Sequence, residues 1–459
     1  MKAKYKDLPV QILTPLIIFL LFGCEDFVNV STPKDQITSV SVFDDQESVQ
    51  AAIVGIYARN MNQHYGFLSG GITVYGGLSS DELENFTTSA AIMEFAQNNL
   101  TAANTNIRNL WNYGYNSIYA ANAIIEGVKS SQLNENVKNR SIGESLFIRG
   151  LVHYYLVNLF GDIPYIRGTD FRENMTVSRQ SAKSVLESIV EDLELAKSLI
   201  EDDYQSDSRA RPNRHTVSAL LSRVYLHLND WENSIFEADA VINSGMYSIN
   251  EDPGAVFQKN SNETIWQLFP TAGGRDTFEG SVFIPVGFPT NFTASNTLIS
   301  SWDVDDLRRK IWIDSIIVDD QVFYYPFKYK ERIRLSGDPE EYNIVFRLAE
   351  MHLIKAEAHL MKGDTPEAIV NINTIRSRAK TTLLTGGHSI EELYDIIIEE
   401  RRKELFCEWG HRWIDLKRTG KVDGVLSNLK EGWQSTDILY PIPLMELENN
   451  PELTQNSGY

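Results

Sequence analysis

Apolar residues recur every three to four positions along much of this 459-residue chain, which is the spacing of helices that bury one face. The segments with this spacing, which we predict to be helices, are 45–60, 104–128, 140–159, 181–200, 215–228, 232–244, 345–362, 365–379 and 389–408. Residues 246–344 differ, because they are rich in Gly, Pro and aromatic residues and hold short apolar runs. We predict that three of these runs, 264–268, 282–284 and 322–325, are strands. The predicted fold is therefore mainly α, with a loop-rich insert containing short β-strands.

Two of the helical pairs repeat each other at an offset of 134 residues. In the first pair, Ser222 and Ser234 lie twelve positions apart across a short polar turn; in the second pair, Ala356 and Ala368 do the same. Small residues at these positions allow two antiparallel helices to approach closely. The pattern is typical of tetratricopeptide-like helical hairpins, which bury their apolar faces by stacking on neighbouring hairpins.

The earlier predicted helices fit the same hairpin unit if each pair carries an insertion. Helices 45–60 and 104–128 are separated by residues 61–103, and helices 140–159 and 181–200 are separated by a shorter loop. We therefore expect about four hairpins. Insertions into repeat arrays tend to collect on one face, which usually carries the binding function. The first insertion and the loop-rich insert are thus the expected binding regions.

The beginning of the chain is typical of a bacterial lipoprotein signal, with a basic segment, an apolar segment and Leu20-Leu21-Phe22-Gly23-Cys24. We predict a signal peptide over 1–23, acylation of the Cys24 thiol, and a lipidated tether over 24–44. The alternatives are a short membrane anchor or a buried apolar start. The apolar run is shorter than the about 20 residues that span a bilayer, which favours the lipoprotein interpretation.

Charge and cysteine content narrow the function further. The chain has 42 basic and 62 acidic residues, and its net charge of −20 argues against nucleic acid or anionic lipid headgroups as partners. A strongly anionic polysaccharide is also disfavoured, whereas neutral ligands are not. The two cysteines are Cys24 and Cys407. Because the first is assigned to the lipid, we expect no intramolecular disulfide, and we predict that Cys407 is a buried thiol rather than a metal ligand with His411.

The C-terminal part resembles the SusD/RagB family of Bacteroidetes surface lipoproteins. The residues that carry the resemblance are Glu400-Arg401, Glu404-Leu405, Glu408, Arg412, Asp415-Leu416-Lys417-Arg418 and the terminal Asn450-Pro451-Glu452-Leu453-Thr454-Gln455-Asn456-Ser457-Gly458-Tyr459. Ser457 stands where the family usually has proline. Cys24-Glu25-Asp26-Phe27, Trp111 and Tyr119 are also similar to the family, so the resemblance covers essentially the whole mature chain.

The resemblance implies a helical scaffold that docks as a lid on a SusC-like TonB-dependent outer-membrane transporter and captures a nutrient, generally an oligosaccharide. It also implies a position on the extracellular face of the outer membrane, anchored through Cys24. We expect a single SusD-like domain over 45–459, with helical repeats at 45–245 and 345–408, the insert at 246–344, and a C-terminal segment at 409–459. We expect the charged C-terminal residues to form ion pairs that tie the last helix to the repeats.

A sugar site needs an aromatic face for the apolar side of the ring and polar groups for the hydroxyls. The two insertions supply both, and the resemblance implies that ligand contacts come from these regions. The candidates are Tyr75, Asp81, Asn85 and Phe86 in the first insertion and Arg275, Phe278 and Phe288 in the second. For each of them, packing within the loop is the alternative explanation.

No catalytic motif of the HExxH, GxSxG or P-loop kind is present, and we predict neither an enzyme nor a cofactor. Pairs of carboxylates suited to glycoside hydrolysis occur by chance in a chain with 62 acidic residues, so their presence does not indicate a glycosidase. Two alternatives stay open: a scaffold or peptide-binding lipoprotein without a sugar ligand, and a glycan-cleaving lipoprotein. The first alternative predicts that the two insertions lie apart, whereas the sugar-binding hypothesis predicts that they converge on one aromatic-lined hollow.

Overall fold

A computed structural model describes residues 41–271 and 273–459. The predicted signal peptide, the acylated Cys24 and all of the predicted tether before residue 41 lie outside the described residues. Across the described ranges, no helix combines the length and the apolar character needed to cross a membrane.

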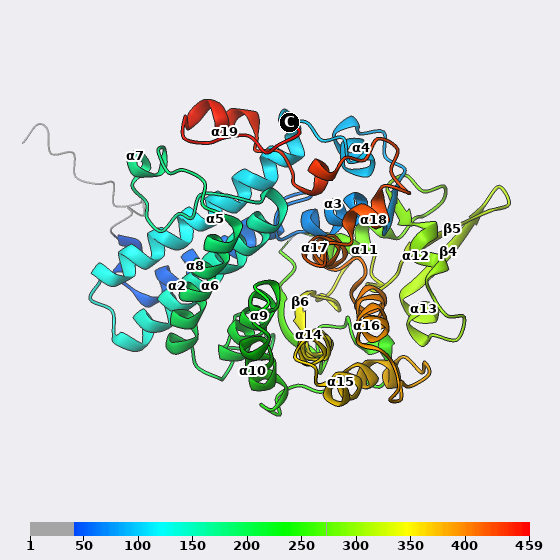
Figure 1. Cartoon of the computed structure of the whole chain (residues 1–459). Helices are drawn as coiled ribbons and strands as arrows, with labels where there is room; N and C mark the ends of the chain where they lie inside the picture. The colour runs from blue at the N-terminus through cyan, green and yellow to red at the C-terminus, as the bar shows by residue number, and fades with distance from the viewer. Residues whose placement is uncertain (1–40, 272) are drawn as a thin grey trace, which may run out of the picture.

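The described chain is mainly helical, as predicted, and short strands occur in the insertions (Figure 1). In chain order the helices are α2 (Gln46–Met61), α3 (Gly71–Ser79), α4 (Ala90–Gln97), α5 (Thr105–Ser130), α6 (Glu135–Phe160), α7 (Phe171–Asn174), α8 (Ala182–Leu199), α9 (Arg214–His227), α10 (Trp231–Ile242), α11 (Phe278–Phe283), α12 (Asn296–Ser300), α13 (Leu307–Trp312), α14 (Leu348–Met361), α15 (Thr365–Arg378), α16 (Ile390–Leu405), α17 (His411–Arg418), α18 (Val422–Leu426) and α19 (Leu444–Asn449).

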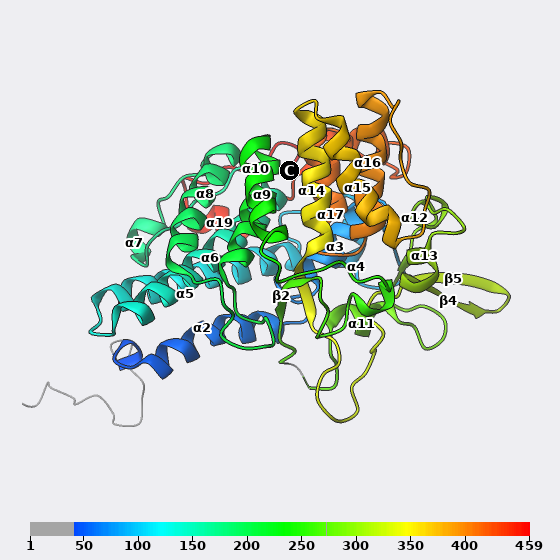
Figure 2. The same ribbon diagram turned by 90° about the horizontal axis from the view of Figure 1, so that it is seen from below.

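The long helices form one stacked array. Helix α2 packs on α5, α5 on α6, α6 on α8 and α8 on α9; α9 and α10 form a hairpin, and α10 packs on α14. Helix α14 in turn packs on α15 and α16. Figure 2 shows this succession from below, with the strands and α11 to one side of it. The predicted tetratricopeptide-like scaffold of about four hairpins is therefore confirmed.

The hairpins close as the small residues predict. The Ser222 hydroxyl donates to the carbonyl of Ser234, the Ser234 hydroxyl donates to the carbonyl of Ser222, and both distances are 2.9 Å. In the turn between them, Asn229 adopts a left-handed conformation (φ 59°) and Asp230 caps α10. In the second hairpin, Ala356 and Ala368 occupy the same positions and are fully buried. The small residues therefore pack against each other in both hairpins, with reciprocal hydrogen bonds in the first.

Within residues 41–271 and 273–459, the strands pair into three two-stranded antiparallel sheets. The pairs are β1 (Leu83–Asn85) with β3 (Phe292–Ala294), β2 (Thr264–Leu268) with β6 (Asn343–Arg347), and β4 (Ile313–Val318) with β5 (Gln321–Pro326). The predictions of strands at 264–268 and 322–325 are confirmed. The prediction at 282–284 is wrong, because these residues end helix α11, which the Thr277 side chain caps by accepting from the Gly280 amide.

Helices α6, α14 and α3 also differ from the prediction, and α6 begins at Glu135 rather than at residue 140. The helix predicted over 345–362 begins at Leu348, because the residues before it pair with β2 as strand β6. Helix α3 was not predicted because it contains several glycines, which disfavour helices. Its glycines permit a close contact: a Cβ added to Gly76 would lie 2.9 Å from the Cα of Gly410.

The C-terminal charges form a buried ion-pair network that joins α16 to the rest of the array. Glu404 is fully buried and accepts from Arg308 at 2.9 Å, from Arg378 at 2.5 Å and from Arg347 at the start of α14. Arg418 of α17 binds Glu357 of α14 at 2.5 Å. The predicted ties between the last helices and the repeats are therefore present.

Arg412 departs from this arrangement, since its partner is Asp81 in the first insertion rather than a residue of the repeats. Cys407 is a buried free thiol, as predicted. No group of three or more His, Cys, Asp or Glu side chains that could hold a metal ion occurs in the part of the chain that the structure describes.

Candidate functional site

The two insertions meet in space although about 200 residues separate them in the sequence. Strand β1 of the first insertion pairs with β3 of the second, and Leu83 faces Ala294 while Asn85 faces Phe292. Below them, the Thr271 hydroxyl donates to the side-chain oxygen of Asn62 at 2.9 Å. The insertions therefore converge, which is one part of what the sugar-binding hypothesis predicts, and the aromatic residues that they bring together form an exposed surface.

Three phenylalanines form a surface cluster beside the β1–β3 pair, which we call the insert cluster. Phe86 comes from the first insertion, and Phe288 and Phe323 come from the second. Their ring centroids are 5.9, 5.6 and 5.3 Å apart in edge-to-face arrangements. Phe288 is 55% exposed and the other two rings are half-buried. The cluster thus presents aromatic surface to solvent, held in place by mutual contacts.

Asn85, the residue before Phe86, carries an amide whose orientation is fixed. Its side-chain oxygen accepts from the backbone amide and the hydroxyl of Thr87, at 3.0 and 2.8 Å. These two bonds fix the orientation of the side chain, and its NH₂ group makes no hydrogen bond to another residue within the described ranges. A half-buried amide of fixed orientation with a free donor group suits a ligand with hydroxyl groups.

A second group, the His64 cluster, lies where the segment before α3 meets the segment before α11. The Tyr65 ring contacts Tyr75 and Phe278 at centroid distances of 5.8 and 4.8 Å, and His64 lies 5.2 Å from Phe278. The Arg275 guanidinium lies 5.0 Å above the Phe278 ring. Tyr75 and Phe278 are buried, so they support the cluster from below, whereas His64 is exposed and Arg275 is half-buried.

The electrostatics of this second cluster favour a neutral imidazole. Partial burial and the charge of Arg275 both lower the pKa of His64 below its ordinary value. At neutral pH the ring of His64 therefore has one nitrogen that donates and one that accepts. The guanidinium of Arg275 stays charged, and it makes no ion pair with a described residue. Both groups can hydrogen-bond to a ligand at this edge.

Asp81 does not join either cluster. Its carboxylate is buried and lies 2.7 Å from Arg412 and 2.8 Å from Arg402. Burial alone would raise the pKa of Asp81, but these two guanidinium groups outweigh it and hold that pKa below its ordinary value. The carboxylate is thus occupied by an internal role, which is the packing alternative.

Of the predicted site residues, the structure therefore places Asn85, Phe86, Arg275 and Phe288 at the surface where the insertions meet. Sequence reasoning missed His64, Tyr65 and Phe323, which complete the two clusters. Phe323 carried a usable signal, because it lies in the predicted strand 322–325, where alternate side chains face opposite sides. His64 and Tyr65 carried none, since nothing local shows that their segment meets α11.

Comparisons with known proteins agree with this picture. A family model described as "Starch-binding associating with outer membrane" matches residues 26–226, and one described as "SusD family" matches residues 320–459. The chain is 27% identical to SusD-like protein P2 of Formosa agariphila over 504 aligned positions, covering 97% of this chain and 98% of that protein. It is 35% identical to the starch-binding protein SusD of Bacteroides thetaiotaomicron over 123 positions, which cover 25% of this chain and 21% of that protein.

The fold is likewise similar to solved structures. A SusD superfamily protein from Bacteroides vulgatus superposes with a TM-score of 0.80 at 21% identity, covering 91% of this chain and 100% of that chain. A SusD superfamily protein from Bacteroides thetaiotaomicron gives a TM-score of 0.76 at 26% identity, with 90% and 99% covered. The likeness extends over nearly the whole of the described chain.

Proposed function

Because this chain belongs to the SusD/RagB family, we propose that it is a cell-surface lipoprotein that binds a glycan where its two insertions converge. The observation that carries the proposal is the insert cluster, in which aromatic rings from both insertions form one exposed surface. Aromatic rings stack on the apolar faces of sugar rings, and amides bind hydroxyl groups. Protein–glycan contact of this kind requires no catalytic group, and we propose no enzymatic activity.

The proposed contact residues are Asn85, Phe86, Phe288 and Phe323, with His64 and Arg275 at the neighbouring cluster. Tyr75 and Phe278 act beneath them as support, and Asp81 is assigned to the internal ion pairs. The division predicted from the sequence, with one SusD-like domain over 45–459, stays part of this proposal.

The position and the partner of the protein are also proposals. We infer that acylated Cys24 anchors the chain on the extracellular face of the outer membrane. We further infer that the helical scaffold docks as a lid on a SusC-like TonB-dependent transporter. Deletion of the protein should then abolish oligosaccharide uptake while extracellular hydrolysis continues; unchanged uptake would contradict the lid.

Affinity electrophoresis tests the glycan-binding proposal. The mature chain, produced in soluble form from the residue after Cys24, is run through gels that contain plant, fungal or host polysaccharides. At least one polysaccharide should retard it, and Phe288→Ala should weaken that interaction about tenfold, or about 1.4 kcal/mol. Phe236→Ala is the matched control, because this ring is 63% exposed on α10, away from the insertions.

The results separate the parts of the proposal. Equal retardation of Phe288→Ala and wild type would show that the insert cluster is not the site. A wild-type protein that no polysaccharide retards would contradict glycan binding and favour a peptide cargo or a scaffold.

A further inference from the structure

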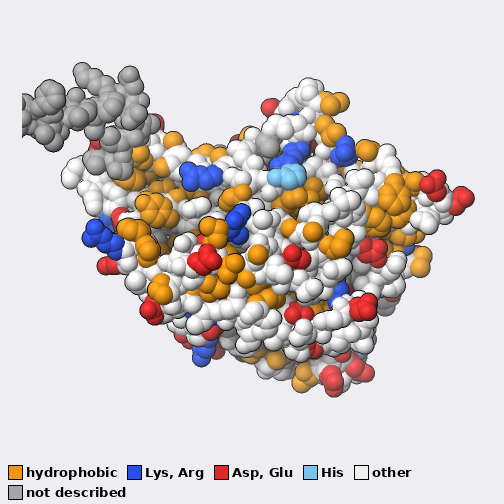
Figure 3. Space-filling model, turned by 90° about the horizontal axis from the view of Figure 1, so that it is seen from above, with side chains coloured by type: hydrophobic (Ala, Val, Ile, Leu, Met, Phe, Trp, Pro, Cys, Tyr) orange, Lys and Arg blue, Asp and Glu red, His pale blue; other side chains and the backbone are white. Residues whose placement is uncertain are grey.

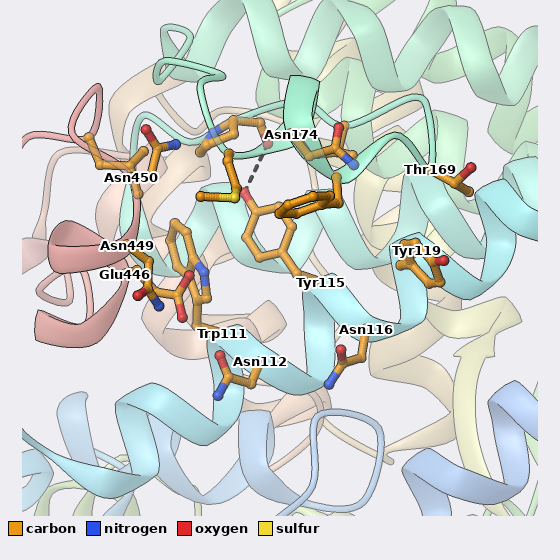
Figure 4. A pocket seen from close by; sticks show the side chains of 15 residues that line it. Trp111, Asn112, Tyr115, Asn116, Tyr119, Thr169, Asn174, Glu446, Asn449 and Asn450 are labelled. Atoms are coloured by element: carbon orange, nitrogen blue, oxygen red, sulfur yellow. Dashed lines mark hydrogen bonds between the residues drawn. The ribbon is translucent and has the colours of Figure 1, made fainter. Parts of the chain in front are cut away.

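A cavity of about 550 Å³ lies away from both clusters, between α5, the segment that contains α7, and the C-terminal helix α19 (Figures 1 and 4). Its volume is in the range of small-molecule sites. Neither the insert cluster nor the His64 cluster contributes to its lining. We propose that this cavity is a second sugar site, which binds a short neutral oligosaccharide. The inference extends the proposed function, since it gives the same protein a second place to hold glycan.

One wall of the cavity is an aromatic stripe on α5. Trp111, Tyr115 and Tyr119 follow each other at intervals of four residues and so lie on one face of the helix (Figure 4). Each interval rises about 6 Å, so the stripe extends over about 12 Å. The Trp111 and Tyr115 rings lie 4.7 Å apart. Because Trp111 is buried, the part of the stripe that a ligand can reach extends from Tyr115 to Tyr119, over about 6 Å, and Phe171 adds a further aromatic ring to the lining.

The stripe changes from buried to exposed along its length. Trp111 is 3% exposed, Tyr115 is half-buried and Tyr119 is 53% exposed. Across the cavity, Phe171 of α7 is 65% exposed. Large aromatic side chains that remain exposed on two facing elements leave apolar surface which a bound ring would cover.

Polar groups accompany the aromatic wall. Asn112 and Asn116 lie at the rim on α5, and Asn449 lies on α19 (Figure 4). Within the described ranges, the amides of these three side chains make no hydrogen bond to another residue. Each can donate two hydrogen bonds and accept more, which matches the paired hydroxyls of a sugar.

Other polar residues of the lining already have internal partners, among them Asn174, which donates to the carbonyl of Gly168, and Thr169, which donates to Glu126. Asn450 donates to the carbonyl of Val177 at 3.0 Å and accepts from the backbone amide of Glu452 at the same distance. Burial raises the pKa of the Glu446 carboxyl, and the neighbouring Trp111 side chain opposes this shift. The hydrogen bonds of Asn450 fix α19 against its neighbours, so the cavity wall is held in place before a ligand arrives.

The charge of the lining selects among ligand classes. Glu446 is its one ionisable acid or base besides the tyrosines, and Lys, Arg and His do not contribute. A phosphate, sulfate or uronate would meet no cation here and would face a carboxylate. On the face that carries α19, charged side chains outside the grey region are scattered among hydrophobic ones (Figure 3). The walls are helices and loops rather than a free strand edge, which disfavours an extended peptide. The lining therefore favours a neutral ligand with several hydroxyl groups over an anionic ligand or an extended peptide.

The test is calorimetric titration of the mature chain with maltoheptaose, cellohexaose, xylohexaose, mannohexaose and laminarihexaose. The first variant combines Phe86→Ala, Phe288→Ala and Phe323→Ala, which removes the insert cluster. At least one oligosaccharide should still bind this variant. Its affinity should fall at least tenfold when Tyr119→Ala and Phe171→Ala are added.

Two controls distinguish binding from folding. Tyr119→Phe keeps the aromatic ring. The variant that combines Tyr119→Phe with Phe171→Ala should therefore bind with an affinity within about threefold of that of the variant with Phe171→Ala alone. Phe236→Ala should leave the affinity unchanged. The variants at Tyr119 and Phe171 should keep the thermal midpoint of their parent, because these two side chains are more than half exposed.

The contrary outcomes are distinct. If the wild type binds an oligosaccharide but the variant without the insert cluster binds none, the second site is refuted while the proposed function stands. Residual binding that Tyr119→Ala and Phe171→Ala leave unchanged would also refute it. If the wild type binds none of the five, both this inference and the proposed function for neutral glycans fail.

Discussion

Glu404 is the centre of the buried ion-pair network, and Glu404→Gln removes its charge with almost no change in shape. Loss of one member of a buried pair costs about 3–5 kcal/mol, because an uncompensated charge remains in the interior. Each arginine that binds Glu404 also forms an ion pair with a second carboxylate, which remains in the Glu404→Gln variant. These pairs are Arg308 with Asp306, Arg347 with Glu408, and Arg378 with Glu263. We therefore expect a loss of about 3 kcal/mol, at the lower end of that range.

Urea unfolding at pH 7, followed by circular dichroism and tryptophan fluorescence, measures this loss as a shift of the midpoint. The matched control is Glu187→Gln. Glu187 forms an exposed pair with Lys183 at 3.8 Å on α8, so its removal should cost less than about 0.5 kcal/mol. A loss below about 1 kcal/mol for Glu404→Gln, or a loss equal to that of the control, would refute the structural role of the network.

The same comparison has a defined pH dependence. Burial alone would raise the pKa of Glu404, but Arg378, Arg347 and Arg308 outweigh it and hold that pKa well below 4.5. A carboxylate whose folded pKa is depressed contributes stability that is fully present above its unfolded pKa and is lost as the pH falls through its folded pKa. The difference between wild type and Glu404→Gln should therefore be constant from pH 8 to pH 5.5 and shrink below about 4.5. A difference that persists in acid would mean that the loss is not ionic.

Two further substitutions test other parts of the fold. Burial raises the pKa of Glu82 to about 7, so its contribution is favourable below pH 4.5 and is lost as the pH rises through 7. The free energy of unfolding of Glu82→Gln minus that of the wild type should therefore be up to about 3 kcal/mol larger at pH 8 than at pH 4. Urea titrations at the two pH values measure this difference, and a difference that does not change with pH would contradict the prediction. Ser222→Ala removes one buried hydrogen bond and should cost about 1 kcal/mol, whereas Ser222→Leu should cost about 3 kcal/mol through overpacking. Equal thermal shifts for the two variants would show that α9 and α10 do not need a small residue here.

The helical hairpins were predictable because their determinants are local. Ser222 and Ser234 are twelve residues apart, and the Asn229-Asp230 turn between them supplies both a left-handed residue and a helix cap. The apolar period of the flanking helices is long enough to be unambiguous. The run at 282–284 failed for the opposite reason, since three apolar residues fit a strand and the end of a helix equally well.

The candidate site was predictable only in part, because its partners are distant in the sequence. The role of Asp81 depends on Arg412, which is 331 residues further along the chain, and no local pattern reveals that pairing. The cavity beside α5 likewise depends on residues that are distant in the sequence. The stripe that starts at Trp111 is visible as an interval of four residues, but its facing walls, Phe171 and Glu446, come from segments whose approach only the tertiary structure determines.

These distant partners also explain why the site can be rigid although it is built from insertions. Asp81 is held by Arg412 and Arg402, and next to it Glu82 accepts from the backbone amide of Cys407 at 3.1 Å. Strand β1 begins one residue later and pairs with β3, so the first insertion is fixed to the C-terminal helices just before it reaches Phe86. Ordering a loop in advance lowers the entropic cost of binding. The acidic residues of this segment thus fix the loop that carries the aromatic ring of the proposed site.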